Sequence, residues 1–348
     1  MSGLTTTLYD TSTLLGVMKE LHAPTTYWLD LCFGSQITSE DEWIDFSKIR
    51  SERKIAPFVS PLAQGRPIYS EGAEVARFKP TYIKPKDPVT AARTIKRRPG
   101  EILSNAPNNP MARYNAIVAD ILSEHYDAIV RRWEWLAAKA VIDGKVVVES
   151  DDMPTRLIDF KRDPGHTIVL AGGAKWGSAG VSIIQNIETW RTMARNAKFG
   201  GPINRVTVGA DVWEVMRKND ELLEQLNVNQ RGTNANFVTG IREGERIEYV
   251  GNISPTLPVF VYSETYKEAI TGVETPYMAS TDVVLTGPNI NGFRCFGAIL
   301  DKAAQLRAMA VFPKMWDEQD PSVTQIMTQS APLMVPVNPN NSVKATVL

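Results

Sequence analysis

The chain has few of the residues on which most enzymes and disulfide-rich domains depend. Its 348 residues include two cysteines and three histidines. Cys32 and Cys295 lie far apart and outside any Cys-x-x-Cys spacing, so the sequence predicts neither a disulfide framework nor a zinc site. We expect both thiols to be buried for structural reasons.

Long hydrophobic stretches are also missing. No run of about 18 apolar residues occurs, and residues 1–20 lack the basic start and apolar core of a secretory signal. The sequence therefore predicts neither a membrane span nor export, and we expect synthesis and assembly in a cytoplasm. With 43% hydrophobic and 22% charged residues, the composition is that of an ordinary folded protein with room for two or three domains.

Motifs that carry chemistry are absent as well. The chain has no HExxH, GxSxG, EF-hand or Walker sequence, and Gly172-Gly173-Ala174-Lys175 has the wrong spacing for a phosphate loop. His125 lies on the apolar stripe of a predicted helix, which favours a packed core histidine. The three consecutive acids Glu40-Asp41-Glu42 are typical of a turn. The sequence predicts no catalysis, no cofactor and no metal.

The most distinctive segment present is Arg53–Arg98, which is basic and rich in proline. It holds eleven Lys/Arg against three Asp/Glu, a charge of +8, and since the whole chain carries −1 the remainder carries −9. Its prolines predict that no helix forms there. We interpret it as a hairpin reaching outward, with a turn at Ser70-Glu71-Gly72-Ala73; a disordered linker is the alternative.

The rest of the sequence predicts a mixed α+β protein. Residues 11–21 and the apolar run Tyr27–Phe33 indicate short helical pieces in an N-terminal arm, and a long helix is predicted from Pro110 to Gly144. Further helices are expected at Ser182–Ala197 and Ala210–Leu226. The predicted strands lie at 146–149, 157–160, 167–170, 205–208, 247–250, 259–262, 282–285 and 293–299, and the end of the chain from Met315 is expected to be extended.

The charge distribution favours contacts between copies of the chain. Nucleic-acid binders usually carry a net basic balance, whereas this chain has a sequence pI of about 6.4 despite the run Lys96-Arg97-Arg98. Contacts between the +8 and −9 portions of identical copies account for the imbalance better. The candidate inter-subunit residues are Arg66, Tyr69, Glu71, Arg77, Phe78, Lys79, Tyr82, Lys84, Lys86, Arg97 and Arg98.

Three segments carry a resemblance to a known family. They are FVSPLAQGRPIYSEGAEVARFKPTYIKPK (Phe58–Lys86), Leu285–Asp301 around Gly-Phe-Arg-Cys-Phe-Gly, and Pro313–Val337 with Gln-Ser-Ala-Pro-Leu-Met. With them the chain resembles the lambda-type tailed-phage major capsid proteins, the phage major capsid protein E family, which have the Hong Kong 97 fold. Residues 143–201 depart from the family, so no feature is carried over there.

The resemblance implies a division of the chain into five parts. These are an N-terminal arm (1–52), an extended hairpin called the E-loop (53–100), a peripheral domain with a long spine helix (101–175), an axial domain (176–300), and C-terminal strands that return to the peripheral domain (301–348).

The resemblance also implies a function. The chain would self-assemble through pentamers and hexamers into the icosahedral head shell of a tailed phage, enclosing double-stranded DNA without sequence-specific binding. Implied partners are a cementing protein, a scaffold and a portal, and the location is the virion. A lysine–asparagine weld between Lys79, Lys84 or Lys86 and Asn338, Asn340 or Asn341 is not expected in this family type. A non-viral compartment shell of the same fold and an enzyme are the alternatives.

Overall fold

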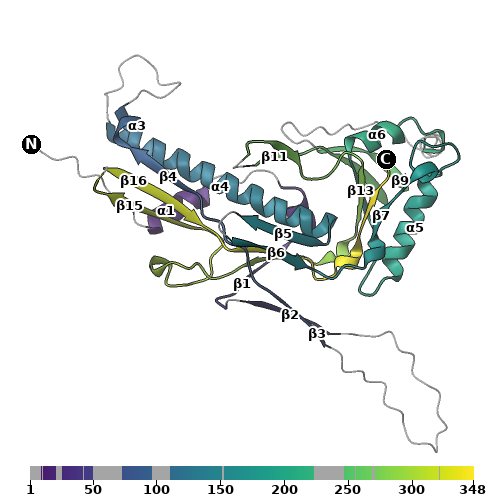
Figure 1. Cartoon of the computed structure of the whole chain (residues 1–348), viewed down its shortest axis with the longest axis horizontal. Coiled ribbons are helices and arrows are strands. Elements are labelled where there is room, and N and C mark those ends of the chain that lie inside the picture. The colour runs from purple at the N-terminus through teal and green to yellow at the C-terminus, as the bar shows by residue number, and fades with distance from the viewer. Residues whose placement is uncertain are drawn as a thin grey trace, which may run out of the picture.

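The structure is a computed structural model that describes residues 9, 11–20, 26–41, 43–49, 73–95, 110–150, 153–222, 247–254, 256–268, 271–320 and 322–348. The molecule is elongated (Figure 1). A long helix runs through the body, a six-stranded sheet with two covering helices forms one end, and a two-stranded hairpin projects from one side. Helices and long runs of strands are largely separate along the chain and most strand pairs are antiparallel, as expected of an α+β protein.

The longest element is α4 (Pro110–Ile142, 33 residues), which confirms the predicted long helix. At 1.5 Å per residue it spans roughly 50 Å. The helix ends just before Gly144, whose φ of 67° is a conformation that glycine adopts without strain. A Cβ at Gly144 would also lie 2.9 Å from the Arg162 side chain. The buried guanidinium of Arg162 donates to the carbonyl of Val141 (2.9 Å) and so satisfies one of the last carbonyls of the helix.

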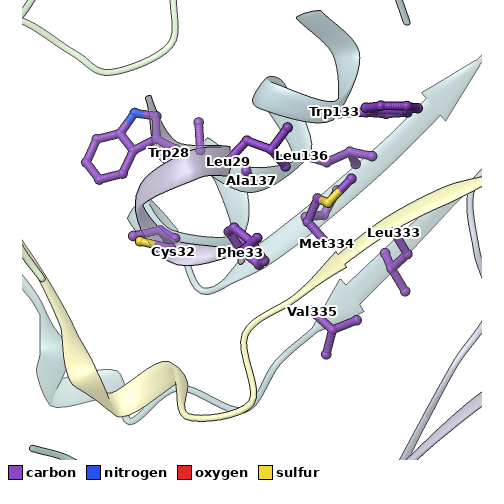
Figure 2. Close-up of a cluster of buried hydrophobic side chains, with 14 of the residues drawn as sticks. Trp28, Leu29, Cys32, Phe33, Trp133, Leu136, Ala137, Leu333, Met334 and Val335 are labelled. Atoms are coloured by element: carbon purple, nitrogen blue, oxygen red, sulfur yellow. The ribbon is translucent and has the colours of Figure 1, made fainter. Parts of the chain in front are cut away.

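Helix α2 (Trp28–Cys32) packs against the middle of α4 and a three-stranded sheet. That sheet has the order β1 (Ser35–Thr38), β14 (Phe293–Phe296), β17 (Pro332–Val335), with β1 parallel and β17 antiparallel to β14. Figure 2 shows the cluster from α2, α4 and β17. Cys32 and Cys295 are both free and buried here, which confirms their predicted structural role.

A second sheet lies beside the first half of α4. Its order is β15 (Phe312–Glu318), β16 (Val323–Gln329), β4 (Lys86–Thr90), and all pairs are antiparallel. Helix α1 (Thr11–Glu20) packs Leu14 and Met18 into the cluster between this sheet and α4. The helical spacing predicted at residues 11–21 is therefore confirmed.

The six-stranded sheet has the order β7 (Thr167–Val169), β18 (Ser342–Thr346), β13 (Asp282–Thr286), β8 (Arg205–Val208), β10 (Leu257–Tyr262), β9 (Ile247–Ser254). The pairs β7–β18 and β8–β10 are parallel and the others antiparallel. Helices α5 (Ile183–Asn196) and α6 (Ala210–Met216) bury an apolar face in the same cluster. Ser182 caps α5 by accepting the N–H of Gln185 at 3.1 Å.

Three smaller pairs of strands complete the described chain. They are the hairpin β2 (Ile44–Ile49) with β3 (Ala73–Phe78), the hairpin β5 (Lys145–Ser150) with β6 (Met153–Asp159), and β11 (Thr265–Lys267) with β12 (Glu274–Pro276), all antiparallel. Short 3₁₀ turns lie at 164–166, 172–174, 288–290, 302–304 and 339–341, and α3 occupies Ala91–Ile95.

Two expectations about the basic segment are wrong. Helix α3 lies inside 53–98, because the stretch between Pro88 and Pro99 is free of proline and begins with the helix-forming pair Ala91-Ala92. The turn expected at 70–73 is also misplaced. Ala73 is already in β3 and pairs with Ile49, so the first strand of the hairpin precedes residue 53.

Two further elements depart from expectation. The helix predicted over Ala210–Leu226 is interrupted: α6 ends at Met216, and helical residues resume at 220–222, where the side chain of Asn219 accepts the N–H of Leu222 (3.2 Å) as a cap. Residues 223–226 lie outside the described residues. Strand β7 pairs with β18 instead of the β5–β6 hairpin. Strand β18, near the end of the chain, lies inside the six-stranded sheet between β7 and β13.

Candidate inter-subunit surface

The hairpin β2–β3 projects from the body and pairs only within itself among the described residues (Figure 1). Its register runs from Ile44 opposite Phe78 to Ile49 opposite Ala73. Across it, the Arg77 guanidinium donates to both carboxylate oxygens of Asp45 at 2.7 and 2.9 Å, which lowers the pKa of that carboxyl. The pair is exposed and contributes little to stability, but its forked geometry favours one register.

Aromatic side chains seat the base of the hairpin on the body. Phe78 packs against Phe46 across the hairpin and against Phe160 after β6, with ring centroids 6.3 and 5.4 Å apart. Phe46 in turn lies 5.9 Å from Phe293 on β14. The hairpin therefore leaves the body with a defined direction.

Polar contacts fix the chain directly after β3. Arg156, on β6, donates to the carbonyls of Lys79 and Pro80, both at 3.0 Å. Thr81 donates its N–H and its hydroxyl to the carbonyl of Pro332 at 3.1 and 2.6 Å. Ile83 then forms a two-way backbone pair with Ser330. The leg of the hairpin that follows β3 is thus tied both to β6 and to the start of β17.

A groove of about 400 Å³ lies at this base. Its lining includes Glu40 and Asp41, which are exposed and precede β2. It also includes Leu300 and Leu306, which are 75% and 56% exposed. Lys79, Pro80, Thr81, Tyr82, Gly297, Ala298 and Ala331 complete the lining. The groove therefore combines apolar and acidic surface beside the hairpin.

The loop that displays the two leucines is held firmly. Asp301 accepts from Lys314 (3.0 Å), from Gln329 (3.0 Å) and from the N–H of Ala303 (2.9 Å). These partners outweigh the effect of burial and lower the pKa of the Asp301 carboxyl. Leu306 has a φ of 58°, a conformation that costs a non-glycine residue about 1–2 kcal/mol. The contacts of Asp301 thus hold the loop in a conformation that leaves the Leu306 side chain exposed.

Six of the predicted contact residues lie within the described chain. Arg77 and Phe78 belong to β3, Lys79 and Tyr82 line the groove, and Lys84 and Lys86 are exposed. The Lys86 ammonium lies 3.8 Å from the Glu318 carboxylate and 5.1 Å from the Trp316 ring. The structure therefore shows partners within the chain for several of these residues, and their role in contacts between copies stays a prediction. Arg66, Tyr69, Glu71, Arg97 and Arg98 lie outside the described residues.

Sequence reasoning missed several residues of this surface. Arg156 belongs to a hairpin about 75 residues after the segment that it ties down, and nothing in its neighbours marks that contact. Leu300 and Leu306 were not singled out, because an apolar residue in a sequence gives no sign of being exposed. Glu40 and Asp41 were interpreted only as turn acids.

Within the described residues, no group of His, Cys, Asp or Glu could hold a metal ion, and no described helix is long and apolar enough to cross a membrane. His125 is 3% exposed and hydrogen-bonds Thr328 (3.0 Å) and Asp87 (2.9 Å), so the predicted packed core histidine is confirmed.

Comparisons with known proteins agree with this picture. The family model of phage major capsid protein E matches residues 10–347. Major capsid proteins of Escherichia phage N15 (29% identity) and Escherichia phage lambda (28% identity) are similar over 97% of this chain and 98% of their own length.

Solved structures show the same fold. A putative capsid protein of a prophage of E. coli CFT073 has a TM-score of 0.74 at 23% identity, covering 98% of this chain and 99% of that one. The mature capsid of bacteriophage PhiM1 has a TM-score of 0.54 at 10% identity, covering 93% and 87%. Because the family match spans nearly the whole chain, the protein belongs to the phage major capsid protein E family, with the Hong Kong 97 fold and a place in the phage head shell.

Proposed function

We propose that the chain builds the icosahedral head of a tailed phage by contacts between its own copies, as pentamers and hexamers, and performs no catalysis. The shell would enclose double-stranded DNA without reading its sequence. Scaffold, portal and cementing proteins would be its partners during assembly in the host cytoplasm. The names of the relatives favour this function over a compartment that encloses cargo protein.

The projecting hairpin is the observation that carries the proposal. A two-stranded sheet is at best marginally stable in water, and among the described residues no strand pairs with either outer edge of β2–β3. In the proposed shell, a neighbouring copy supplies the hydrogen-bond partners that these strand edges lack. Its firmly seated base means that little orientational freedom is lost on contact.

We assign the parts of the fold to shell positions by analogy with the family. Helix α4 with its neighbouring sheets serves as the peripheral unit and spine, and the six-stranded sheet with α5 and α6 serves as the axial unit. On this assignment β18 links the end of the chain to the axial unit. The boundaries at 1–52, 53–100, 101–175, 176–300 and 301–348 remain predictions, and β18 argues against a single C-terminal unit.

The groove is our candidate for the acidic side of the contact. Glu40 and Asp41 beside Leu300 and Leu306 suit a segment of a second copy that is both basic and apolar, as residues 53–98 are. Each exposed pair contributes only about 0–1 kcal/mol, so the effect depends on repetition over many copies.

Stabilisation of the finished shell would come from a cementing protein. The asparagines considered for a covalent weld are engaged within the chain: Asn338 donates to the carbonyl of Asn289 (2.8 Å), Asn340 donates to that of Lys198 (2.9 Å), and Asn341 is fully buried. We propose that the arm before α1 and the hairpin edges receive the cementing protein by strand addition.

The purified chain is expected to form rings or shells far heavier than one subunit. Light scattering and negative-stain electron microscopy at rising concentration measure this directly. A stable monomer at high concentration, together with the lack of capsomers or heads in infected cells, would refute the proposal.

Reversing charge beside the hairpin should slow assembly. The variant Lys79→Glu/Lys84→Glu/Lys86→Glu changes the local charge by six units, while the subunit should keep its fold because these side chains are exposed or half-buried. The control Lys175→Glu/Lys218→Glu/Lys267→Glu changes the net charge by the same amount at exposed positions outside the hairpin and the groove. Light scattering at low salt follows both. Equal rates for the two variants would show that the position of the basic charge is unimportant.

A further inference from the structure

The segment Tyr27–Phe33 contacts three parts of the molecule at once, namely α4, the six-stranded sheet and the three-stranded sheet. It contains α2, whose five residues are too few for a stable helix on their own. Its contacts reach α4, the six-stranded sheet and the three-stranded sheet, and its partners lie more than 100 residues away in the sequence.

The contact with α4 is made by one buried carboxylate. Glu134 is 4% exposed and accepts three backbone N–H groups, from Tyr27 (3.1 Å) and Trp28 (2.8 Å) on Oε1 and from Leu29 (2.9 Å) on Oε2. These are the donors that the first turn of a helix leaves unsatisfied. The charge of Glu134 is therefore met by the amides and the dipole of α2.

The contact with the six-stranded sheet is made by Tyr27. Its hydroxyl lies 2.8 Å from the Thr207 hydroxyl on β8, and its ring stacks on Tyr262 of β10 at 5.1 Å. The Arg205 guanidinium lies over the same ring at 5.9 Å. Tyr27 thus ties the segment to the six-stranded sheet through its side chain and to α4 through its backbone N–H.

The far end of the segment is tied to β14. Arg294 donates to the carbonyls of Phe33 (2.6 Å) and Leu29 (3.2 Å) and pairs with Asp30 at 2.8 Å. The N–H of Gly292 donates to the carbonyl of Cys32 at 2.9 Å. A Cβ at Gly292 would lie 2.4 Å from the Phe33 ring, so only glycine permits this approach.

We propose that Tyr27–Phe33 is a releasable latch, held by Glu134, that sets the angle between α4 and the six-stranded sheet. The latch belongs to the N-terminal arm and lies between α4 and the six-stranded sheet, which the chain also connects elsewhere. Its use in changing the shape of subunits within a shell rests on the proposed function; its existence in the free subunit does not.

The latch has a built-in response to pH. Burial raises the pKa of the Glu134 carboxyl to about 7, opposed by the three backbone hydrogen bonds and assisted by Asp30. In the released state Glu134 would be hydrated and have an ordinary pKa near 4.5. Protons therefore bind more tightly to the latched state, so the latch is firmest below about pH 4.5, weakens by up to tenfold per pH unit between about pH 4.5 and 7, and changes no further above that.

The other groups that face Glu134 keep their charge over this range. Burial, followed by the negative charge of Glu134, raises the pKa of Cys32, Tyr262 and Tyr277, so all three stay protonated. Burial also raises the pKa of Tyr27. The nearby charged groups are Asp30, which is paired with Arg294, and Arg205 over the Tyr27 ring. Glu134 is thus the group in this cluster that changes charge near neutrality.

Hydrogen exchange on the unassembled subunit tests the latch from about pH 4.5 to about pH 8.5. The protection factors of amides 28–33, which correct for the intrinsic pH dependence of exchange, should fall by up to tenfold per unit between about pH 4.5 and 7 and level off above that. Glu134→Gln, which mimics the protonated carboxyl, should give a flat profile. Glu134→Ala should lose protection at every pH, because three buried donors lose their acceptor. Glu124→Gln, an exposed change on the same helix, is the control.

A distance measurement separates a latch from a local packing defect. Spin labels placed with Arg132→Cys on α4 and Asn252→Cys on β9 report the angle between the two units, since both positions are exposed and the native cysteines are buried. Glu134→Ala should broaden the distance distribution while secondary structure persists. Wild-type protection that does not change between about pH 4.5 and 7, or an unchanged distance distribution in Glu134→Ala, overturns the proposal whether or not the chain forms shells.

Discussion

Replacing Lys344 by methionine should lower the free energy of unfolding of the subunit by about 3–5 kcal/mol at pH 7. The Lys344 ammonium lies between two carboxylates, 3.0 Å from Asp143 at the end of α4 and 3.1 Å from Asp282 on β13. Asp282 is 3% exposed. Methionine keeps the length of the stem but leaves the buried Asp282 carboxylate without its cation and the partly exposed Asp143 with Lys139 alone. Equilibrium denaturation measures the loss.

The effect of this variant should depend on pH. Lys344 and Lys139 outweigh the effect of burial and hold the pKa of Asp143 below its ordinary 3.8. The stabilisation is therefore complete above about pH 4 and is lost as pH falls through the lowered pKa, so the two proteins should converge in acid. Lys218→Met, at a side chain 73% exposed, is the control and should change stability by less than about 0.5 kcal/mol. A difference below about 1 kcal/mol at pH 7 would show that the ion pairs do not join α4 to the six-stranded sheet.

Replacing Trp28 by alanine should cost about 3–5 kcal/mol, as for other large core side chains. Trp28 is fully buried in the cluster between α2, α4 and β17 (Figure 2) and makes edge-to-face contacts with Tyr27 (5.0 Å) and Tyr262 (5.7 Å). Its indole N–H has no hydrogen-bond partner among the described residues, so the loss comes from packing alone. Thermal and denaturant unfolding measure it.

The matched control is Trp43→Ala. Trp43 is 44% exposed, and its ring lies 6.0 Å from the Lys79 ammonium, an interaction that contributes about 0.5–1 kcal/mol at an exposed site. The two substitutions remove the same atoms, so burial decides the difference between them. Equal effects would contradict the position of Trp28 in the core.

Local patterns predicted the elements that depend on nearby residues. The 3.6-residue spacing from Pro110 to Gly144 gave the position of α4, since capping and periodicity act within a few turns. The strand at 205–208 was predicted to the residue. The boundaries of the hairpin were not, because the partner of β3 lies about 29 residues earlier and register depends on that distant strand.

The contact residues remain a prediction. The excess of basic charge drew attention to residues 53–98, of which Arg77 and Phe78 lie on β3, and Lys79 and Tyr82 line the groove at the base of the hairpin. Arg156, Leu300 and Leu306 gave no signal, because exposure and contacts to carbonyl groups follow from how distant segments meet.

By itself the sequence determined the composition, the absence of recognisable catalytic motifs, the long helix and the likeness to a capsid family, all of which reside in residue type and short spacing. The tertiary structure decided that β18 lies in the six-stranded sheet, that Lys344 meets Asp143 and Asp282, and that Glu134 holds Tyr27–Phe33. These contacts join residues 62 to 201 positions apart. Their free energy comes from burial and from charges brought together by the whole fold, which no local pattern encodes.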